Sequence, residues 1–145
     1  MRTVDGGDTW EAYQNPGVSN TLQYRDVHAF DVDTVAAMSA GQGNESQIHL
    51  FNAKTQTWSV LFVMDNPNGF LDSISFWGAR GLAYGDSVDA GKPYVLTTKD
   101  QGRSWAQINP QSLPDSVNGK IIWGIKPPLP SPSPLIKCNK IPEVI

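Results

Sequence analysis

The sequence predicts an all-β fold made of short strands, and three observations lead to this prediction. Eleven of the fourteen acidic residues are Asp, whose short carboxylate suits turns, and only three are Glu, which suits helices. Thirteen glycines and eleven prolines interrupt the chain, so that apolar residues keep helical spacing for no more than about a turn. Runs rich in Val, Ile, Thr and aromatic residues recur between these turn residues, as is typical of strands.

The strand-like runs come in groups of four. In one group the expected strands cover residues 24–30, 34–40, 47–52 and 57–63, and in the next they cover 72–77, 81–86, 93–98 and 104–108. Gly and Asp residues punctuate most of the connections between them, which favours tight antiparallel turns. Each group therefore predicts one small antiparallel sheet.

An internal repeat relates the two groups. Three segments, residues 3–10, 51–58 and 98–105, end in Trp10, Trp58 and Trp105, which are 48 and then 47 positions apart. Upstream of the tryptophans, residues 26–30 align with residues 72–76 at a spacing of 46. Four strands in a unit of about 47 residues are typical of one blade of a β-propeller.

We therefore expect a partial β-propeller with about two complete four-stranded antiparallel blades. The expected divisions are residues 1–23 (the end of a first blade, with its turn and outer strand), 24–66 (the second blade), 67–118 (the third blade) and 119–145 (an incomplete strand and a tail). Six of the eleven prolines lie within 127–142, and alternating prolines keep such a tail out of a sheet interior.

Closure of the ring sets a further expectation. Propellers use about four to eight blades, and 145 residues supply only about three units of this length. We therefore expect the chain to be a fragment of a longer propeller. Its open blade faces would expose apolar residues such as Ile74, Phe76 and Trp77 and would lead to self-association.

Residues 3–10 and 98–105 match the pattern Ser/Thr-x-Asp-x-Gly-x-Thr/Ser-Trp. This motif resembles the BNR/Asp-box β-propeller superfamily, and the wider stretch is most similar to the photosystem II assembly/stability factor-like branch, with its WD40/YVTN/BNR-like repeats. The motif residues are expected to be structural: Asp5, Gly7, Thr9, Trp10, Thr57, Trp58, Asp100, Gly102, Ser104 and Trp105.

Elementary chemistry explains why such a motif belongs to a turn. An Asp carboxylate can accept hydrogen bonds from the backbone N–H groups of a tight turn, and Gly tolerates a positive φ. The indole ring packs on the sheet while its N–H is expected to find an acceptor. In residues 51–58, Ala53 and Thr55 replace the Asp and the Gly, so we expect a looser turn capped by Asn52. The double change Ala53→Asp and Thr55→Gly is then expected to raise the melting temperature.

The resemblance implies a non-catalytic scaffold that binds an unidentified protein partner, and full-length relatives that are exported, periplasmic or thylakoid-lumenal. Two alternatives stay open: a fragment of a sialidase-type glycoside hydrolase with most of its site missing, and a nonfunctional truncated product. A sialidase site needs three arginines with a Tyr/Glu pair, and four Arg and three Glu in the whole chain do not assemble one. Whether the chain is an enzyme stays open, with the balance toward a non-enzyme. We assign no catalytic, cofactor-binding or metal-binding residue.

Composition argues against several other functions. The net charge is −3 and no basic cluster occurs, which argues against nucleic-acid binding. No apolar run approaches the length of a membrane span, and the single Cys138 excludes an internal disulfide. His28 and His49 lie on strands of different units, which favours structural histidines over metal ligands. Arg25 and Arg80 are candidates either for a docking surface or for surface ion pairs.

Overall fold

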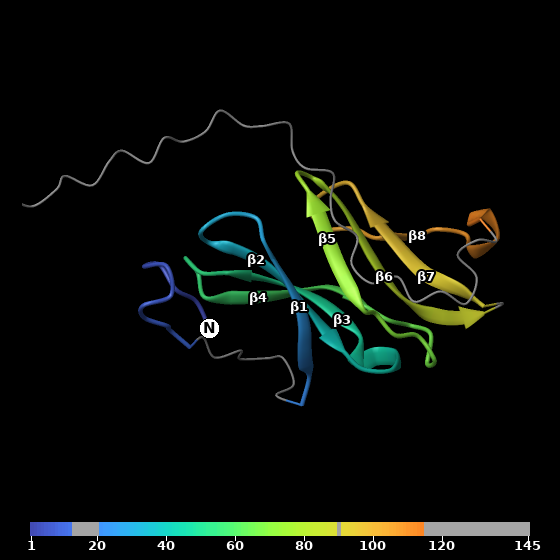
Figure 1. The fold of residues 1–145 in the computed structure, drawn as a ribbon, viewed down its shortest axis with the longest axis horizontal. Coiled ribbons are helices and arrows are strands. Elements are labelled where there is room, and N and C mark those ends of the chain that lie inside the picture. Colours follow the sequence, from blue (N-terminus) through green and yellow to red (C-terminus); the bar gives the residue numbers. More distant parts are fainter. Residues whose placement is uncertain (13–20, 90, 115–145) are drawn as a thin grey trace, which may run out of the picture.

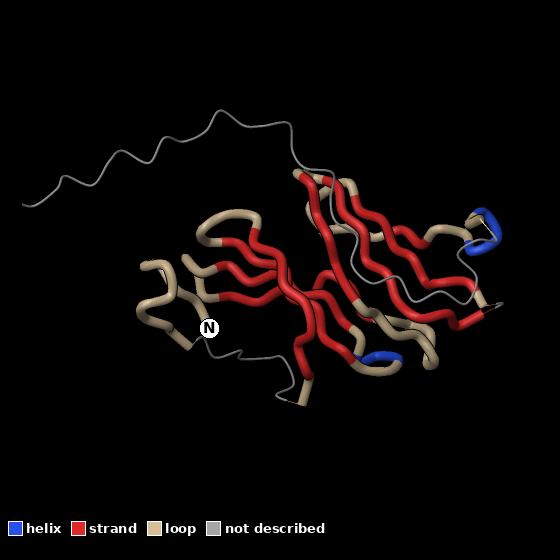
Figure 2. The backbone as a smooth tube through the Cα atoms, in the orientation of Figure 1, coloured by secondary structure: helices blue, strands red, loops and turns tan. Residues whose placement is uncertain are grey.

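The computed structural model describes residues 1–12, 21–89 and 91–114, and in this part of the chain it is an all-β protein, as predicted (Figures 1 and 2). The strands are β1 (Gln23–Ala29), β2 (Thr34–Ala40), β3 (Gln47–Asn52), β4 (Thr57–Val63), β5 (Ser73–Trp77), β6 (Arg80–Asp89), β7 (Lys92–Thr98) and β8 (Ala106–Gln107). Two short 3-10 helices, η1 (Gly43–Glu45) and η2 (Pro110–Ser112), follow β2 and β8. The expected Pro-rich tail within 119–145 lies outside the described residues.

The strands form two separate four-stranded antiparallel sheets, in the orders β1-β2-β3-β4 and β5-β6-β7-β8. Each strand therefore pairs with its neighbour in the sequence, as expected of simple up-and-down sheets. Three strands have the predicted bounds, and β1 begins one residue earlier than predicted. The largest differences are in the second sheet, where β6 is longer than predicted and β8 contains only two residues. Among the described residues, no helix is both long and apolar enough to span a membrane.

One apolar core joins the two sheets, which lie with β1 next to β5 (Figure 1). Its fully or nearly fully buried members are Ala36, Met38, Ile48, Met64, Leu71, Ile74, Phe76, Ala83, Tyr94 and Leu96. The prediction that Ile74 and Phe76 occupy an exposed face is wrong, because they are only 5% and 3% exposed. They pack against the first sheet, where the ring of Phe30 meets that of Phe76 edge-on at 4.7 Å between centroids.

A carboxylate also links the sheets. Asp26 follows an irregularity in β1, where the register with β2 shifts between Tyr24 and Asp26. Its Oδ2 accepts hydrogen bonds from the hydroxyl of Ser73 at 2.5 Å and from the backbone N–H of Ile74 at 2.9 Å. One side chain of the first sheet therefore satisfies two donors at the start of the second.

Strand pairing defines which residues of the two sheets are equivalent. Two rows in the first sheet, Val27–Ala37–His49 and Ala29–Val35–Phe51, correspond to Ile74–Ala83–Leu96 and Phe76–Gly81–Thr98 in the second. The spacing is thus 47 for β1 and β3 but 46 for β2. Asp26 therefore corresponds to Ser73, and the sequence alignment of residues 26–30 with 72–76 is displaced by one residue. The displacement arises in the β1–β2 hairpin, which is one residue longer than the β5–β6 hairpin, since Ala29 pairs with Val35 and Phe76 with Gly81.

The Asp26 link generates a prediction. Replacing Asp26 with Ala leaves the N–H of Ile74 without its acceptor in a buried position, so we expect the free energy of unfolding to fall by about 1–3 kcal/mol. Urea denaturation followed by tryptophan fluorescence measures the change. Asp65→Ala removes an exposed carboxylate and serves as the matched control. Equal effects of the two substitutions would contradict the assigned role of Asp26.

Candidate functional site

The turn between β7 and β8 is built around the carboxylate of Asp100. Its Oδ1 accepts hydrogen bonds from the Thr98 hydroxyl at 2.8 Å and the Ser104 backbone N–H at 2.9 Å, and its Oδ2 accepts one from the Ser104 hydroxyl at 2.6 Å. The Thr98 oxygen in turn accepts the backbone N–H groups of Asp100 and Gly102. These bonds lower the pKa of Asp100 to about 2, with the Ser104 hydroxyl as the largest cause.

The N-terminal turn around Asp5 contains the same set of five bonds. Thr3 and Thr9 take the places of Thr98 and Ser104, with the Thr3 hydroxyl 2.6 Å and the Thr9 N–H 3.0 Å from Asp5 Oδ1. The remaining three bonds are also present. The pKa of Asp5 is held well below its ordinary value, chiefly by the hydroxyl groups of Thr3 and Thr9. The two segments therefore fold alike, although they lie far apart in the sequence.

Positive φ angles complete both turns. In the C-terminal turn they belong to Gln101 at 59° and Gly102 at 81°, and in the N-terminal turn to Gly6 at 78° and Gly7 at 109°. Gly102 is also crowded, because a Cβ there would lie 3.2 Å from both Leu61 and Trp105 side chains. Glycine at this position thus serves both the backbone conformation and the packing.

The turn between β3 and β4 is built differently. Asn52 Oδ1 accepts the backbone N–H groups of Lys54 at 3.0 Å and Thr55 at 3.2 Å, so the expected cap by Asn52 is present. The positive φ falls at Gln56, at 53°, and not at Thr55. The expected gain from Ala53→Asp with Thr55→Gly loses its basis, because a glycine at position 55 relieves no strain.

The three repeated tryptophans do not share one hydrogen-bonding role. The Trp10 indole N–H donates to the Gly7 carbonyl at 2.9 Å. The indole nitrogens of Trp58 and Trp105 are buried and have no partner among the described residues, so the expectation of an acceptor is wrong for Trp105. Their rings instead pack on aromatic neighbours, at 4.8 Å from Phe51 and 5.8 Å from Phe76. At Trp58 and Trp105, therefore, the ring is held by aromatic packing and not by a hydrogen bond from its indole N–H.

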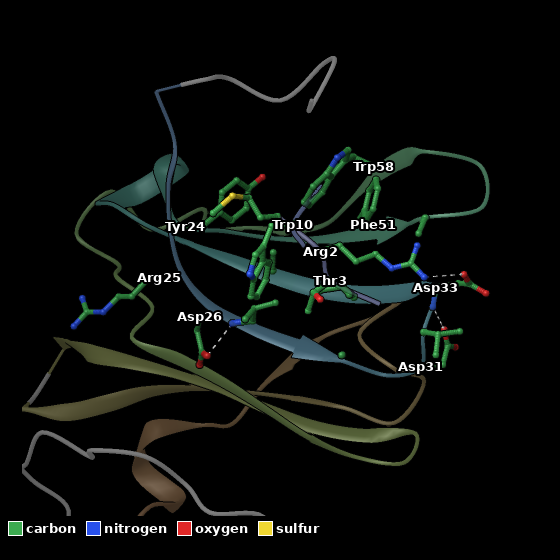
Figure 3. Close-up of a pocket in the computed structure, with 17 residues that line it drawn as sticks. Arg2, Thr3, Trp10, Tyr24, Arg25, Asp26, Asp31, Asp33, Phe51 and Trp58 are labelled. Carbon is green, nitrogen blue, oxygen red and sulfur yellow. Dashed lines mark hydrogen bonds and ion pairs between the residues drawn. The ribbon is translucent and has the colours of Figure 1, made fainter. Parts of the chain in front are cut away.

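A half-open groove of about 900 Å³ lies between the β1–β4 sheet and the N-terminal segment (Figure 3). We call the sheet surface beneath it the groove face: Tyr24, Val27, Ala29, Val35, Ala37, Phe51 and Trp58. Trp10 lies over this face from the N-terminal segment and is 57% exposed. At the rim, Arg2 reaches Asp33 at 3.8 Å. The groove therefore has an apolar, aromatic floor and a rim of mixed charge.

A chain of polar side chains lies under one end of the groove face. The Tyr24 hydroxyl is 2.7 Å from His49 Nδ1, and His49 Nε2 is 2.8 Å from Gln47 Oε1. Because the amide oxygen of Gln47 can only accept, His49 carries its proton on Nε2 and Tyr24 donates to Nδ1. Burial lowers the pKa of His49, which favours this neutral form. His49 is thus a structural histidine, which agrees with the interpretation favoured from sequence.

The two arginines singled out from sequence lie at opposite ends of β5. Arg25 forms an ion pair with Asp72 at 3.2 Å, just before β5, and its guanidinium lies 5.3 Å from the centre of the Phe70 ring. Arg80 pairs with Trp77 across the hairpin that follows β5. The structure therefore does not bring them together into one patch. Arg25 points away from the aromatic floor of the groove (Figure 3).

The groove face was not among the sites predicted from the sequence. The signal was present, since β2 carries apolar residues on both of its sides: Ala36 and Met38 face the core, and Val35 and Ala37 face the groove. The described residues contain no group of three His, Cys, Asp or Glu side chains placed to hold a metal ion. Comparisons of the chain with family models, with curated proteins and with solved structures gave no match.

The Asp100 turn predicts a pH dependence. Because the pKa in the folded state, about 2, lies below the ordinary value of 3.8, the carboxylate stabilises the fold above pH 4 and the contribution is lost as pH falls toward 2. Asp100→Asn is therefore expected to melt at a lower temperature than the parent at pH 7 and at a similar temperature near pH 2. Melting curves across this range measure the difference, with the exposed Asp8→Asn as control. A difference that stays constant with pH would contradict the assignment.

The β3–β4 turn predicts a second effect. Gln56→Gly places glycine at a positive φ and is expected to raise the free energy of unfolding by about 0.5–1 kcal/mol. Thr55→Gly, one residue earlier, is expected to lower the free energy of unfolding by a similar amount, because there the glycine only increases the conformational entropy of the unfolded chain. Chemical denaturation of the two variants measures both. The opposite signs would show that the turn has the construction expected from the sequence pattern.

Proposed function

We propose that the chain is part of an Asp-box β-propeller and that it works as a non-catalytic scaffold for a protein partner. The observation that carries the proposal is the identical set of five hydrogen bonds around Asp5 and Asp100. The residues that make these bonds are those of the Asp-box pattern. Because the polar groups of each turn are hydrogen-bonded to one another, none of them is left for catalysis.

The equivalence of the sheets supports the blade interpretation. The groove face corresponds, strand by strand, to the face of the β5–β8 sheet that contains Ile74 and Phe76. In the second sheet this face is covered by the first sheet. In the first sheet, the described residues that cover the same kind of face are those of the N-terminal segment with its Asp5 turn. In the proposed propeller, that segment is the end of the preceding blade.

In a complete propeller a whole preceding blade would pack on this face; among the described residues the face is open and fits the surface of a protein better than a small substrate. It is half open, and Val27 and Tyr24 in its floor are 65% and 42% exposed. Broad apolar surfaces with a polar rim are typical of protein interfaces. The arginines near the rim are already paired, Arg2 with Asp33 and Arg25 with Asp72, which weakens the alternative of a sialidase-type carboxylate site.

Two assays on the purified chain test this function. In an extract of the source cells, the immobilised chain is expected to capture a protein. The Val27→Lys variant is expected to lose this binding, because Val27 lies in the groove, whereas Val60→Lys is expected to keep it, because Val60 lies outside the groove. The same preparations are expected to leave a fluorogenic sialoside intact. Equal capture by the parent and by Val27→Lys would contradict the scaffold role. Hydrolysis of the sialoside would favour the alternative of a sialidase-type glycoside hydrolase.

A further inference from the structure

The free edges of the two sheets differ in how they are protected. A strand at the edge of a sheet presents unpaired N–H and C=O groups that can pair with another chain. The edges formed by β1 and β5 lie next to each other and are joined through Asp26. The edge formed by β8 has only two residues, Ala106 and Gln107. The fourth edge, β4, has seven residues.

β4 lacks two of the usual protections of an edge strand, charged side chains and proline. Its sequence, Thr57–Val63, contains no charged residue and no proline, and it is rich in β-branched and aromatic side chains. Val60 and Val63 are 55% and 43% exposed. Among the described residues, only β3 pairs with it. A register shift at Leu61 interrupts the ladder with β3 and leaves Thr57–Val60 as the longest regular stretch.

We propose that β4 is a pairing edge that takes the β4 strand of a second copy of this chain, in antiparallel orientation. Two identical strands related by a two-fold axis run antiparallel, so self-pairing produces a closed dimer. Because β4 has no charged residue, no like charges oppose one another across the contact. The two β1–β4 sheets then form one continuous sheet of eight strands. This inference uses only the edge of the sheet and does not depend on the proposed scaffold function.

Sedimentation equilibrium of the full chain over a wide concentration range tests the proposal. We expect a monomer–dimer equilibrium for the parent and a dissociation constant raised about tenfold or more by Val60→Lys, since two-fold symmetry counts each substitution twice. Val63→Lys is expected to act in the same direction. Hydrogen exchange at high concentration is expected to slow at the amides of β4. Both side chains are exposed, so the melting temperatures of the monomers are expected to stay close to that of the parent.

Two matched controls separate the edge from other surfaces. Val32→Lys changes a valine that is 77% exposed in the β1–β2 turn, and Val27→Lys changes one on the groove face. Neither is expected to alter the dissociation constant. A parent that stays monomeric at high concentration, open-ended aggregation, or dimers weakened by Val27→Lys and not by Val60→Lys would each overturn the proposal. Loss of partner capture by Val27→Lys in a chain that still dimerises would concern the scaffold function alone.

Discussion

Contact between the two sheets is the constraint on which the rest of the structure depends. Neither sheet is large, and the described residues contain no disulfide or metal group that staples them, so their stability comes from burying one face against the other. Small residues permit the close approach. Ala36 and Ala83 are fully buried members of the core that the two sheets share. Asp26 links the two sheets, because its carboxylate accepts hydrogen bonds from Ser73 and Ile74 at the start of β5.

The same constraint accounts for the groove. The β1–β4 sheet has two apolar sides, and among the described residues only one of them packs against the other sheet. On the other side of the first sheet, the rings of Tyr24, Phe51 and Trp58 pack on one another and around His49. Mutual packing buries part of this surface, and the N-terminal segment covers another part. The part that stays exposed is the candidate site. The site therefore exists because the first sheet has a second apolar face that the other sheet does not cover.

Alternation and turn residues in the sequence were enough to predict the eight strands and their grouping, since both are local properties. The Asp5 and Asp100 turns were also predictable in outline, because their bonds connect residues no more than four apart. Three features depended on distant contacts and were missed. The register of β1 on β2 displaced the repeat by one residue, aromatic packing left the indole nitrogens of Trp58 and Trp105 without an acceptor among the described residues, and the burial of Phe76 depended on the first sheet. The groove was missed because periodicity within one strand does not say which face a neighbour covers.

The locality of the Asp turns has a consequence for how the chain acquires its shape. The turn around Asp100 is packed against Leu61 and Phe76, whereas Trp10 of the Asp5 turn is largely exposed, and yet the two turns share the same five hydrogen bonds around the Asp carboxylate and the preceding Thr hydroxyl. The local sequence is therefore enough to specify the conformation of the turn, whatever packs around it. Closing so short a loop costs little entropy, so it can form before any long-range pairing exists. A duplication that copies these eight residues to another place in a chain would therefore produce the same turn there, without compensating substitutions elsewhere.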